Sequence, residues 1–110
     1  MSEISWSDFE RVDMRIGTVV RAEPFPEARK PAYKLWIDLG PLGERRSSAQ
    51  ITHYPADELL GRPVVCAVNL GRKRIAGFVS ECLVLGAVDD TGTVRLLRPD
   101  DSTRPGDPIA

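Results

Sequence analysis

Polar and apolar residues alternate through the first half of the chain, and this alternation predicts three β-strands. Residues 14–25 (MRIGTVVRAEPF), 32–40 (AYKLWIDLG) and 44–51 (ERRSSAQI) repeat at every second position, the period of a strand. The first strand places on one face Met14, Ile16, Thr18, Val20 and Ala22. The inward faces of the next two strands are expected to carry Tyr33, Leu35, Ile37 and Leu39, then Ser47, Ala49 and Ile51.

The remaining segments complete the order of a small barrel. Residues 5–13 predict one or two helical turns, and 54–61 (YPADELLG) predict a short helix. Apolar runs at 63–70 (PVVCAVNL) and 81–88 (ECLVLGAV) predict two buried strands. Residues 89–92 (DDTG) predict a hairpin turn before a last strand at 93–99. Three strands, a short helix and two strands are the order of a five-stranded OB-fold barrel.

We therefore expect one all-β domain with small helices over residues 1–110, a length that fits a single domain. It divides into an N-terminal helix (1–13), the barrel (14–87) and a C-terminal extension with added strand (88–110). OB folds bind ligands on the face of strands two and three and on the flanking loops.

Composition narrows the classes of function. A net charge of −1 and a pI near 5.8 argue against holding nucleic acid by overall charge, although a local basic face is compatible with them. No apolar stretch approaches the roughly 20 residues that cross a bilayer, and the first residues do not form a secretory signal. We expect a cytoplasmic protein without membrane insertion, in which Cys66 and Cys82 are reduced, packed thiols.

The outward face of the second and third strands is the first candidate binding surface. Trp36 stands there among charged residues, where an indole can serve as a platform for nucleobases or peptide side chains. The alternative is that it packs against a neighbouring loop or a second subunit. Polar groups on the same face suit a polar ligand; they are Lys34, Arg46, Ser48 and Gln50.

The cationic run Arg72-Lys73-Arg74 is the second candidate. It lies in the connection after the fourth barrel strand, which should border the Trp36 face. Guanidinium groups suit bidentate contacts with phosphate or carboxylate, and a solvated loop is the alternative. The candidate ligand-binding set is completed by Asn69, Ser80 and Glu81.

Catalysis receives little support from the sequence. No nucleophile or phosphate-loop motif occurs, and His53 is the sole imidazole, at the start of the short helix, where capping or packing explains it. A zinc site needs more thiols or imidazoles than the chain supplies. We expect no enzyme activity, no metal and no cofactor.

Longer stretches carry a resemblance to a known family. Residues 9–40, 45–87 and 96–100 (LLRPD) resemble the tRNA-binding-domain superfamily of OB folds over nearly the whole chain. Within it, PEARKPAYKLWIDLG (26–40) and SSAQIT (47–52) are similar to the CsaA family of bacterial export-related chaperones. That resemblance implies a cytoplasmic homodimer, held through the N-terminal helix and the C-terminal additions, that binds unfolded or pre-secretory polypeptide. Relatives with the same barrel bind the outside corner of tRNA.

The cationic stretch follows the pattern of the tRNA-binding relatives in part. These usually read N-[LF]-x-P-[RK]-K-x-x-G-x-x-S-E-G-M, and the positions that fit are Asn69, Lys73, Gly77, Ser80 and Glu81. Cys82–Leu83 replaces Gly–Met, and the family uses that Met against nucleotide. The resemblance therefore implies the fold more specifically than the ligand.

Two binding functions follow as hypotheses. The first is a chaperone of the CsaA kind for unfolded or precursor polypeptides, and the alternative is a tRNA-binding protein that uses the same basic and aromatic surface. A homodimer is expected because a two-turn helix cannot bury its own aromatic side chains in a small barrel. The expected interface residues are Trp6, Phe9, Leu96, Leu97 and Ile109.

Overall fold

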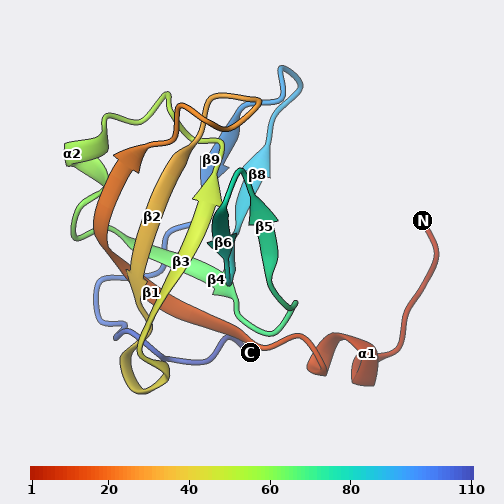
Figure 1. The fold of residues 1–110 in the computed structure, drawn as a ribbon. Coiled ribbons are helices and arrows are strands. Elements are labelled where there is room, and N and C mark those ends of the chain that lie inside the picture. The colour runs from red at the N-terminus through yellow and green to blue at the C-terminus, as the bar shows by residue number, and fades with distance from the viewer.

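The structure, a computed structural model, describes residues 1–110 and is built around a five-stranded antiparallel sheet (Figure 1). The strand order is β3-β2-β1-β4-β7. These strands are β1 (Met14–Pro24), β2 (Tyr33–Asp38), β3 (Glu44–Ala49), β4 (Pro63–Ala67) and β7 (Leu83–Val84). Two hairpins are added to it: β5 (Lys73–Ile75) with β6 (Phe78–Ser80), and β8 (Gly86–Val88) with β9 (Val94–Leu96).

The main sheet curls until β3 meets residues 80–82, which closes the barrel. The amide of Glu81 donates to the carbonyl of Arg46 at 2.8 Å. The buried hydroxyl of Ser47 donates to the carbonyl of Cys82, also at 2.8 Å. The expected OB-fold barrel is confirmed, and the curvature places β3 and the β5–β6 hairpin side by side.

The core is formed by the inward faces that the alternation predicted. Leu35, Ile37 and Leu39 are completely buried, while Lys34 and Trp36 lie on the other face of β2. The predicted short helix is α2 (Ala56–Leu59), and it inserts the fully buried Leu59 into the same core. Apolar burial of this kind stabilises a small domain more than any other term.

The alternation predicted for the first strand is wrong at its centre. The pairing of β1 with β2 shifts between Val19, which opposes Ile37, and Arg21, which opposes Trp36, so Val20 is the extra residue of a β-bulge. Val19 is 1% exposed and Val20 is 47% exposed, although both are valines. The extra residue shifts the inward-facing positions of β1 by one, so that Ala22 packs on the core beyond the bulge, as Val19 does before it.

The single strand predicted at 81–88 is also corrected. It divides into β7, which pairs with β4, and β8, which pairs with β9. Leu85 forms the corner: its amide donates to Val65 and its carbonyl accepts from Leu97. At Gly86 a side chain would lie 2.5 Å from Val94, so only glycine permits this close approach.

The C-terminus lies near the start of β1, whereas the N-terminus lies beyond α1, away from the barrel (Figure 1). The C-terminal residues run along β1, where the amide of Gly106 donates to Ile16 at 2.7 Å and that of Ile109 donates to Met14 at 2.9 Å. The helix α1 (Trp6–Glu10) is capped by Ser5 and Asp8 in a capping box, as its sequence favours. It buries none of its residues and projects away from the barrel (Figure 1).

No helix in the structure has the length and apolar character that crossing a membrane would require.

The β-bulge is tested by truncating its two valines separately. Val19→Ala should lower the free energy of unfolding by about 2–3 kcal/mol, because two buried methyl groups are lost and a cavity remains. Val20→Ala should change it by about 0.5 kcal/mol or less, because that side chain is exposed. Urea unfolding followed by tryptophan fluorescence measures both, and similar losses for the two variants would contradict the bulge.

Candidate ligand-binding groove

The cationic run is part of a β-hairpin and not of the irregular connection that was expected. β5 and β6 are joined by Ala76 and Gly77, whose φ angles are +47° and +84°. Positive φ at both central residues is the geometry of a type I′ turn, which matches the twist of the strands. The Ala-Gly pair between KRI and FVS was the sequence signal for this hairpin.

Alternation within the hairpin separates the three cations. Lys73 opposes Ser80 and shares a face with Ile75 and Phe78, whereas Arg74 opposes Val79 on the other face. Arg72 lies just before β5. The candidate site therefore receives Arg72 and Lys73, and Arg74 points away from it.

Trp36 is on the outward face of β2, as predicted, but it is not an open platform. Its ring meets the ring of Phe78 edge-on, with 5.8 Å between centroids, and the guanidinium of Arg21 lies 4.3 Å from its centroid. Phe78 also contacts Phe25 edge-on at 5.5 Å. The alternative named above, packing against a neighbouring loop, describes its position, because the indole helps to seat the hairpin.

Two other predicted ligand residues lie against this aromatic cluster. The ammonium of Lys34 lies 4.9 Å from the centroid of Phe25, and the guanidinium of Arg46 lies 5.5 Å from that of Phe78. Such cation–π contacts stabilise the cations where they are. Lys34 and Arg46 therefore support the hairpin and are less free to bind a ligand.

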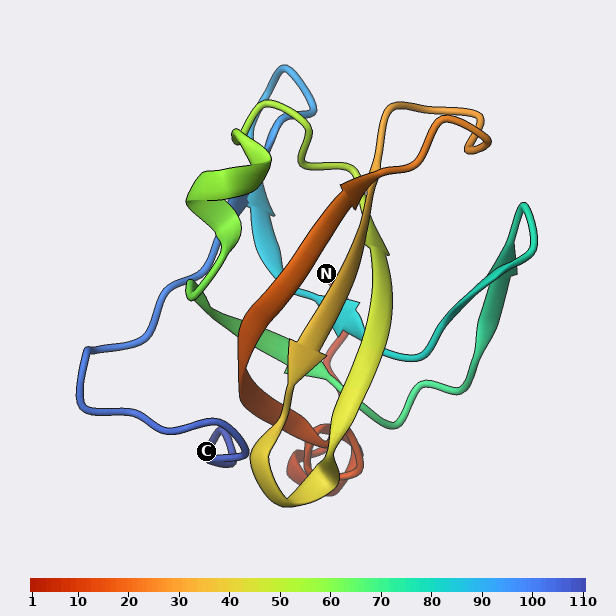
Figure 2. The ribbon, with the colours of Figure 1, turned by 60° about the vertical axis from the view of Figure 1, so that its left-hand side comes forward.

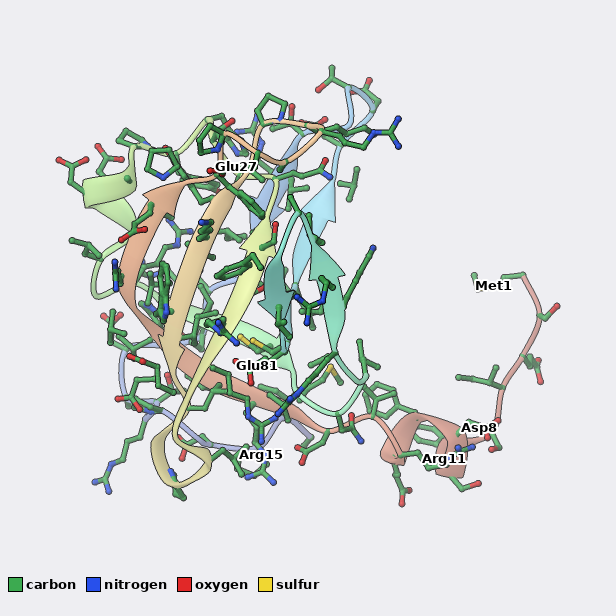
Figure 3. All side chains as sticks on the ribbon, viewed as in Figure 1. Met1, Asp8, Arg11, Arg15, Glu27 and Glu81 are labelled. Atoms are coloured by element: carbon green, nitrogen blue, oxygen red, sulfur yellow. The ribbon has the colours of Figure 1, made fainter.

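Ser80 and Glu81 join the hairpin to the edge of β3. One Glu81 carboxylate oxygen accepts from both the amide and the Nε of Arg46, each at 3.2 Å, and the Ser80 hydroxyl accepts from the amide of Ser48 at 3.2 Å. Figure 3 places Glu81 where the hairpin meets β3. Partial burial opposes ionisation of Glu81, but the two bonds from Arg46 outweigh it and lower the pKa of its carboxyl.

Asn69 has a structural role that the sequence did not reveal. Its side-chain oxygen accepts from the amide of Asp13 at 2.8 Å, and its side-chain nitrogen donates to the carbonyl of Arg11 at 2.7 Å. Both halves of the amide are thus engaged between α1 and β1. Asn69 therefore fixes the direction in which α1 leaves the barrel, and one donor hydrogen and one acceptor lone pair of its side chain stay free.

Two adjoining hollows lie between the hairpin, β3 and the β1–β2 loop. One has a volume of about 300 Å³ and the other about 700 Å³, and Gln50, Lys73 and Ile75 line both. We call them together the cationic groove. Its charged lining residues are Arg29, Lys30, Arg72 and Lys73, and no carboxylate lines it. Its larger apolar lining residues are Leu70, Ile75 and Leu83.

The groove includes residues that the sequence reasoning missed. Arg29 and Lys30 belong to the loop between the first two strands, and their sequence (PEARKP) had been used only for the resemblance. Ser48 and Gln50 were predicted and do line the groove, Ser48 beside Ser80. The arrangement offers hydrogen-bond donors, positive charge and apolar surface together, which suits an anionic or amphipathic chain.

Comparison with known proteins identifies the family. The family model "Putative tRNA binding domain" matches residues 14–108. The chain belongs to this family. Among solved structures, members similar to it are the CsaA chaperone protein from Picrophilus torridus and the chaperone CsaA from Bacillus anthracis, both 48% identical. Their TM-scores are 0.93 and 0.94, and the match covers 98% and 99% of this chain and 100% of each of theirs.

Other members of the tRNA binding domain family are parts of larger enzymes. The methionine–tRNA ligase of Methanocaldococcus jannaschii is 35% identical over 109 residues, which is 99% of this chain and 17% of the ligase. Methionine–tRNA ligase 1 of Sorangium cellulosum is 39% identical over 94% of this chain and 15% of that protein. The chain thus spans about a sixth of the length of these curated relatives.

The residues predicted for a dimer interface do not form one patch in this member of the family. Leu96 is buried in the barrel core, because β9 packs its inward side against Tyr54 and its neighbours. Leu97 is exposed beside β9, whereas Trp6 and Phe9 are exposed on α1, at a distance from that hairpin (Figure 1). Ile109 is half-buried next to Met14, so it is nearer to α1 than Leu97 is.

The remaining titratable candidates have structural surroundings. The ring of His53 lies against Tyr54, with 4.5 Å between centroids, which agrees with the packing alternative. Cys66 and Cys82 are free and buried, and the pKa of the Cys66 thiol is raised by a hydrogen bond with Cys82 and by burial. No three His, Cys, Asp or Glu side chains gather closely enough to hold a metal ion.

The Glu81 contact predicts a pH dependence of stability. Because the folded-state pKa is lowered, its stabilisation is complete above the unfolded value of about 4.3 and is lost as the pH falls through the folded value. Glu81→Gln should therefore be less stable than the native protein near neutral pH, with the difference shrinking in acid. Urea midpoints across pH measure this. The exposed Glu44→Gln is the matched control, and an equal difference at every pH would contradict the assignment.

Proposed function

We propose that this chain is a molecular chaperone of the CsaA kind, which binds unfolded or pre-secretory polypeptides in the cationic groove. The observation that supports this most strongly is the lining of the groove, in which four cations and three larger apolar side chains occur without a carboxylate. An unfolded chain exposes apolar and acidic side chains together, and both find partners there. A folded protein surface would present fewer apolar groups.

The apolar part of the groove is accessible to such a ligand. Leu70 and Leu83 are 58% and 49% exposed, and Ile75 is half-buried beside them. Burying these side chains against an unfolded segment contributes to the free energy of binding in proportion to the apolar area that is removed from water. The match to CsaA chaperones at 48% identity, over the whole of each solved chain, also supports a chaperone.

A tRNA-binding protein is the second candidate. It is favoured by the family to which the chain belongs and by the similarity to methionine–tRNA ligases. The same four cations could contact phosphates. Leu83, which stands where tRNA-binding relatives carry methionine, and the acidic balance of the whole chain favour the polypeptide. Neither function requires a catalytic group, so we propose a binding protein and no enzyme.

The proposed chaperone acts in the cytoplasm as a homodimer, joined through α1. Ile4, Trp6 and Phe9 form an apolar surface on this short arm, and Trp6 is 86% exposed. A surface of this kind on a projecting helix is costly in water unless a partner covers it. Two copies would also place two grooves on one particle, which raises the avidity for long flexible ligands.

The chaperone function is tested by removing positive charge separately from the two faces of the β5–β6 hairpin. The double variant Arg72→Ser/Lys73→Ser should bind reduced, carboxymethylated α-lactalbumin about tenfold more weakly, which corresponds to about 1.4 kcal/mol. It should also suppress the aggregation of denatured luciferase less well. Arg74→Ser, which removes a charge from the opposite face of the same hairpin, is the matched control and should behave like the native protein. A native protein that suppresses no aggregation would exclude the function.

The same native and variant proteins also test the second candidate, tRNA binding. If tRNA is the ligand, a gel shift should detect binding at about 50 mM salt, and each phosphate contacted should contribute roughly −0.7 to −0.9 to the slope of log affinity against log salt. Binding of tRNA without binding of unfolded polypeptide would favour the second candidate.

The dimer is tested by sedimentation equilibrium at micromolar concentration. The native protein should sediment as a dimer, and Trp6→Ser/Phe9→Ser as a monomer, because the apolar face of α1 is removed. Leu60→Ser, at an exposed position just after the distant α2, should leave the dimer intact. A native protein that is already monomeric would contradict the proposal.

A further inference from the structure

The contact between β3 and the hairpin weakens step by step along β3. At Arg46, both backbone groups are engaged: the carbonyl accepts the amide of Glu81 at 2.8 Å, and the amide donates to the Glu81 carboxylate at 3.2 Å. At Ser48, the amide donates only to a side chain, the hydroxyl of Ser80, at 3.2 Å. At Gln50, the amide has no hydrogen-bond partner within the chain, and the residue is exposed. The seam therefore opens as a wedge from Arg46 toward Gln50.

Strand alternation explains which backbone groups face the wedge. The amides of Arg46 and Ser48 point away from β2, toward the free edge of the main sheet, because β3 is its last strand. Two residues further on, the amide of Gln50 points the same way. Figure 2 shows the hairpin leaning away from β3 toward its tip. The free edge of β3 is thus uncovered where the hairpin is most distant.

The cationic groove occupies this wedge. Its smaller hollow is lined by Ser48, Gln50 and Ser80 from the two sides of the seam, and its larger hollow continues past Gln50 to Arg29 and Lys30. An unpaired strand edge is a ready template for the backbone of an extended chain. The groove thus combines such an edge with side-chain contacts on the facing hairpin.

We propose that the bound polypeptide adds to the edge of β3 as an extended strand, with one of its backbone carbonyls accepting the amide of Gln50. This strand pairing rests on the proposed function and specifies how the polypeptide is recognised. Backbone pairing is independent of sequence and gives affinity, while alternate side chains choose between the apolar and cationic walls. The preferred segment therefore alternates apolar and acidic residues, with the apolar ones on Ile75 of the hairpin and the acidic ones on Arg29 and Lys30, which a different element, the β1–β2 loop, contributes.

The first test removes the backbone amide donor of residue 50. Gln50→Pro deletes the amide hydrogen, whereas Gln50→Ala deletes most of the side chain and keeps the amide hydrogen. The preceding Ala49 is in a strand, the conformation that a residue before proline favours, and Gln50 does not have the positive φ that would exclude proline. The probe is a fluorescein-labelled synthetic peptide that alternates valine and glutamate, followed by fluorescence anisotropy. Gln50→Pro should weaken its binding about three- to tenfold, and Gln50→Ala should bind like the native protein.

The second test leaves the protein unchanged, so it does not depend on how the variants fold. Two versions of the peptide carry N-methyl groups, one on its valines and the other on its glutamates. Strand pairing uses the amides of alternate residues, and the valine–glutamate alternation fixes which face is inward. One version should therefore bind about three- to tenfold more weakly than the other, because only one of them carries its methyl groups on the amides that face β3.

The outcomes separate this inference from the proposed function. Equal binding of the two methylated peptides, together with equal binding by Gln50→Pro and Gln50→Ala, would overturn strand pairing while leaving the chaperone function intact. Failure of the native protein to bind either the unmethylated peptide or carboxymethylated α-lactalbumin would instead exclude the chaperone function, and the strand pairing with it.

Discussion

The structure depends on one set of hydrogen bonds, those that attach β3 to residues 80–82. An open sheet of five short strands in a chain of this size would leave much of its apolar face in contact with water. Closure is achieved by one backbone bond, from the amide of Glu81 to the carbonyl of Arg46, and by polar side chains: Ser47 donates to the carbonyl of Cys82, and the Glu81 carboxylate accepts from Arg46. The Ser47 bond is well sheltered, since Ser47 is almost completely buried, and its loss would leave a buried polar group unpaired.

Closure by side chains has a consequence for function. Glu81 and Ser80 satisfy amides of β3 over a short distance, so the hairpin need not run parallel to β3 throughout. Phe78, packed on Trp36 and Phe25, fixes the hairpin from the other side. The seam can therefore remain open beyond Ser48 without unfolding the barrel, and the cationic groove lies in this opening.

The family pattern in the cationic stretch accordingly contains two kinds of residue. Asn69, Ser80 and Glu81 have their side chains engaged in hydrogen bonds within the chain. Arg72 and Lys73 line the groove and form none of the ion pairs in the structure. Much of the family motif thus builds the fold, so the motif is compatible with different ligands. The similarity both to CsaA chaperones and to a segment of methionine–tRNA ligases fits this division.

The sequence by itself determined the barrel and its inner face. The two-residue period of β2 and β3 identified Leu35, Ile37 and Ser47 as inward-facing, because burial on one side of a strand imposes that period. Only the tertiary structure decided the bulge at Val20, the packing of Trp36 on Phe78, the burial of Leu96 and the gathering of Arg29 with Lys73. The physical reason is that alternation reports which side of a strand is shielded from water. It does not report which distant segment provides the shield, because that depends on how the closed sheet brings separate parts of the chain together.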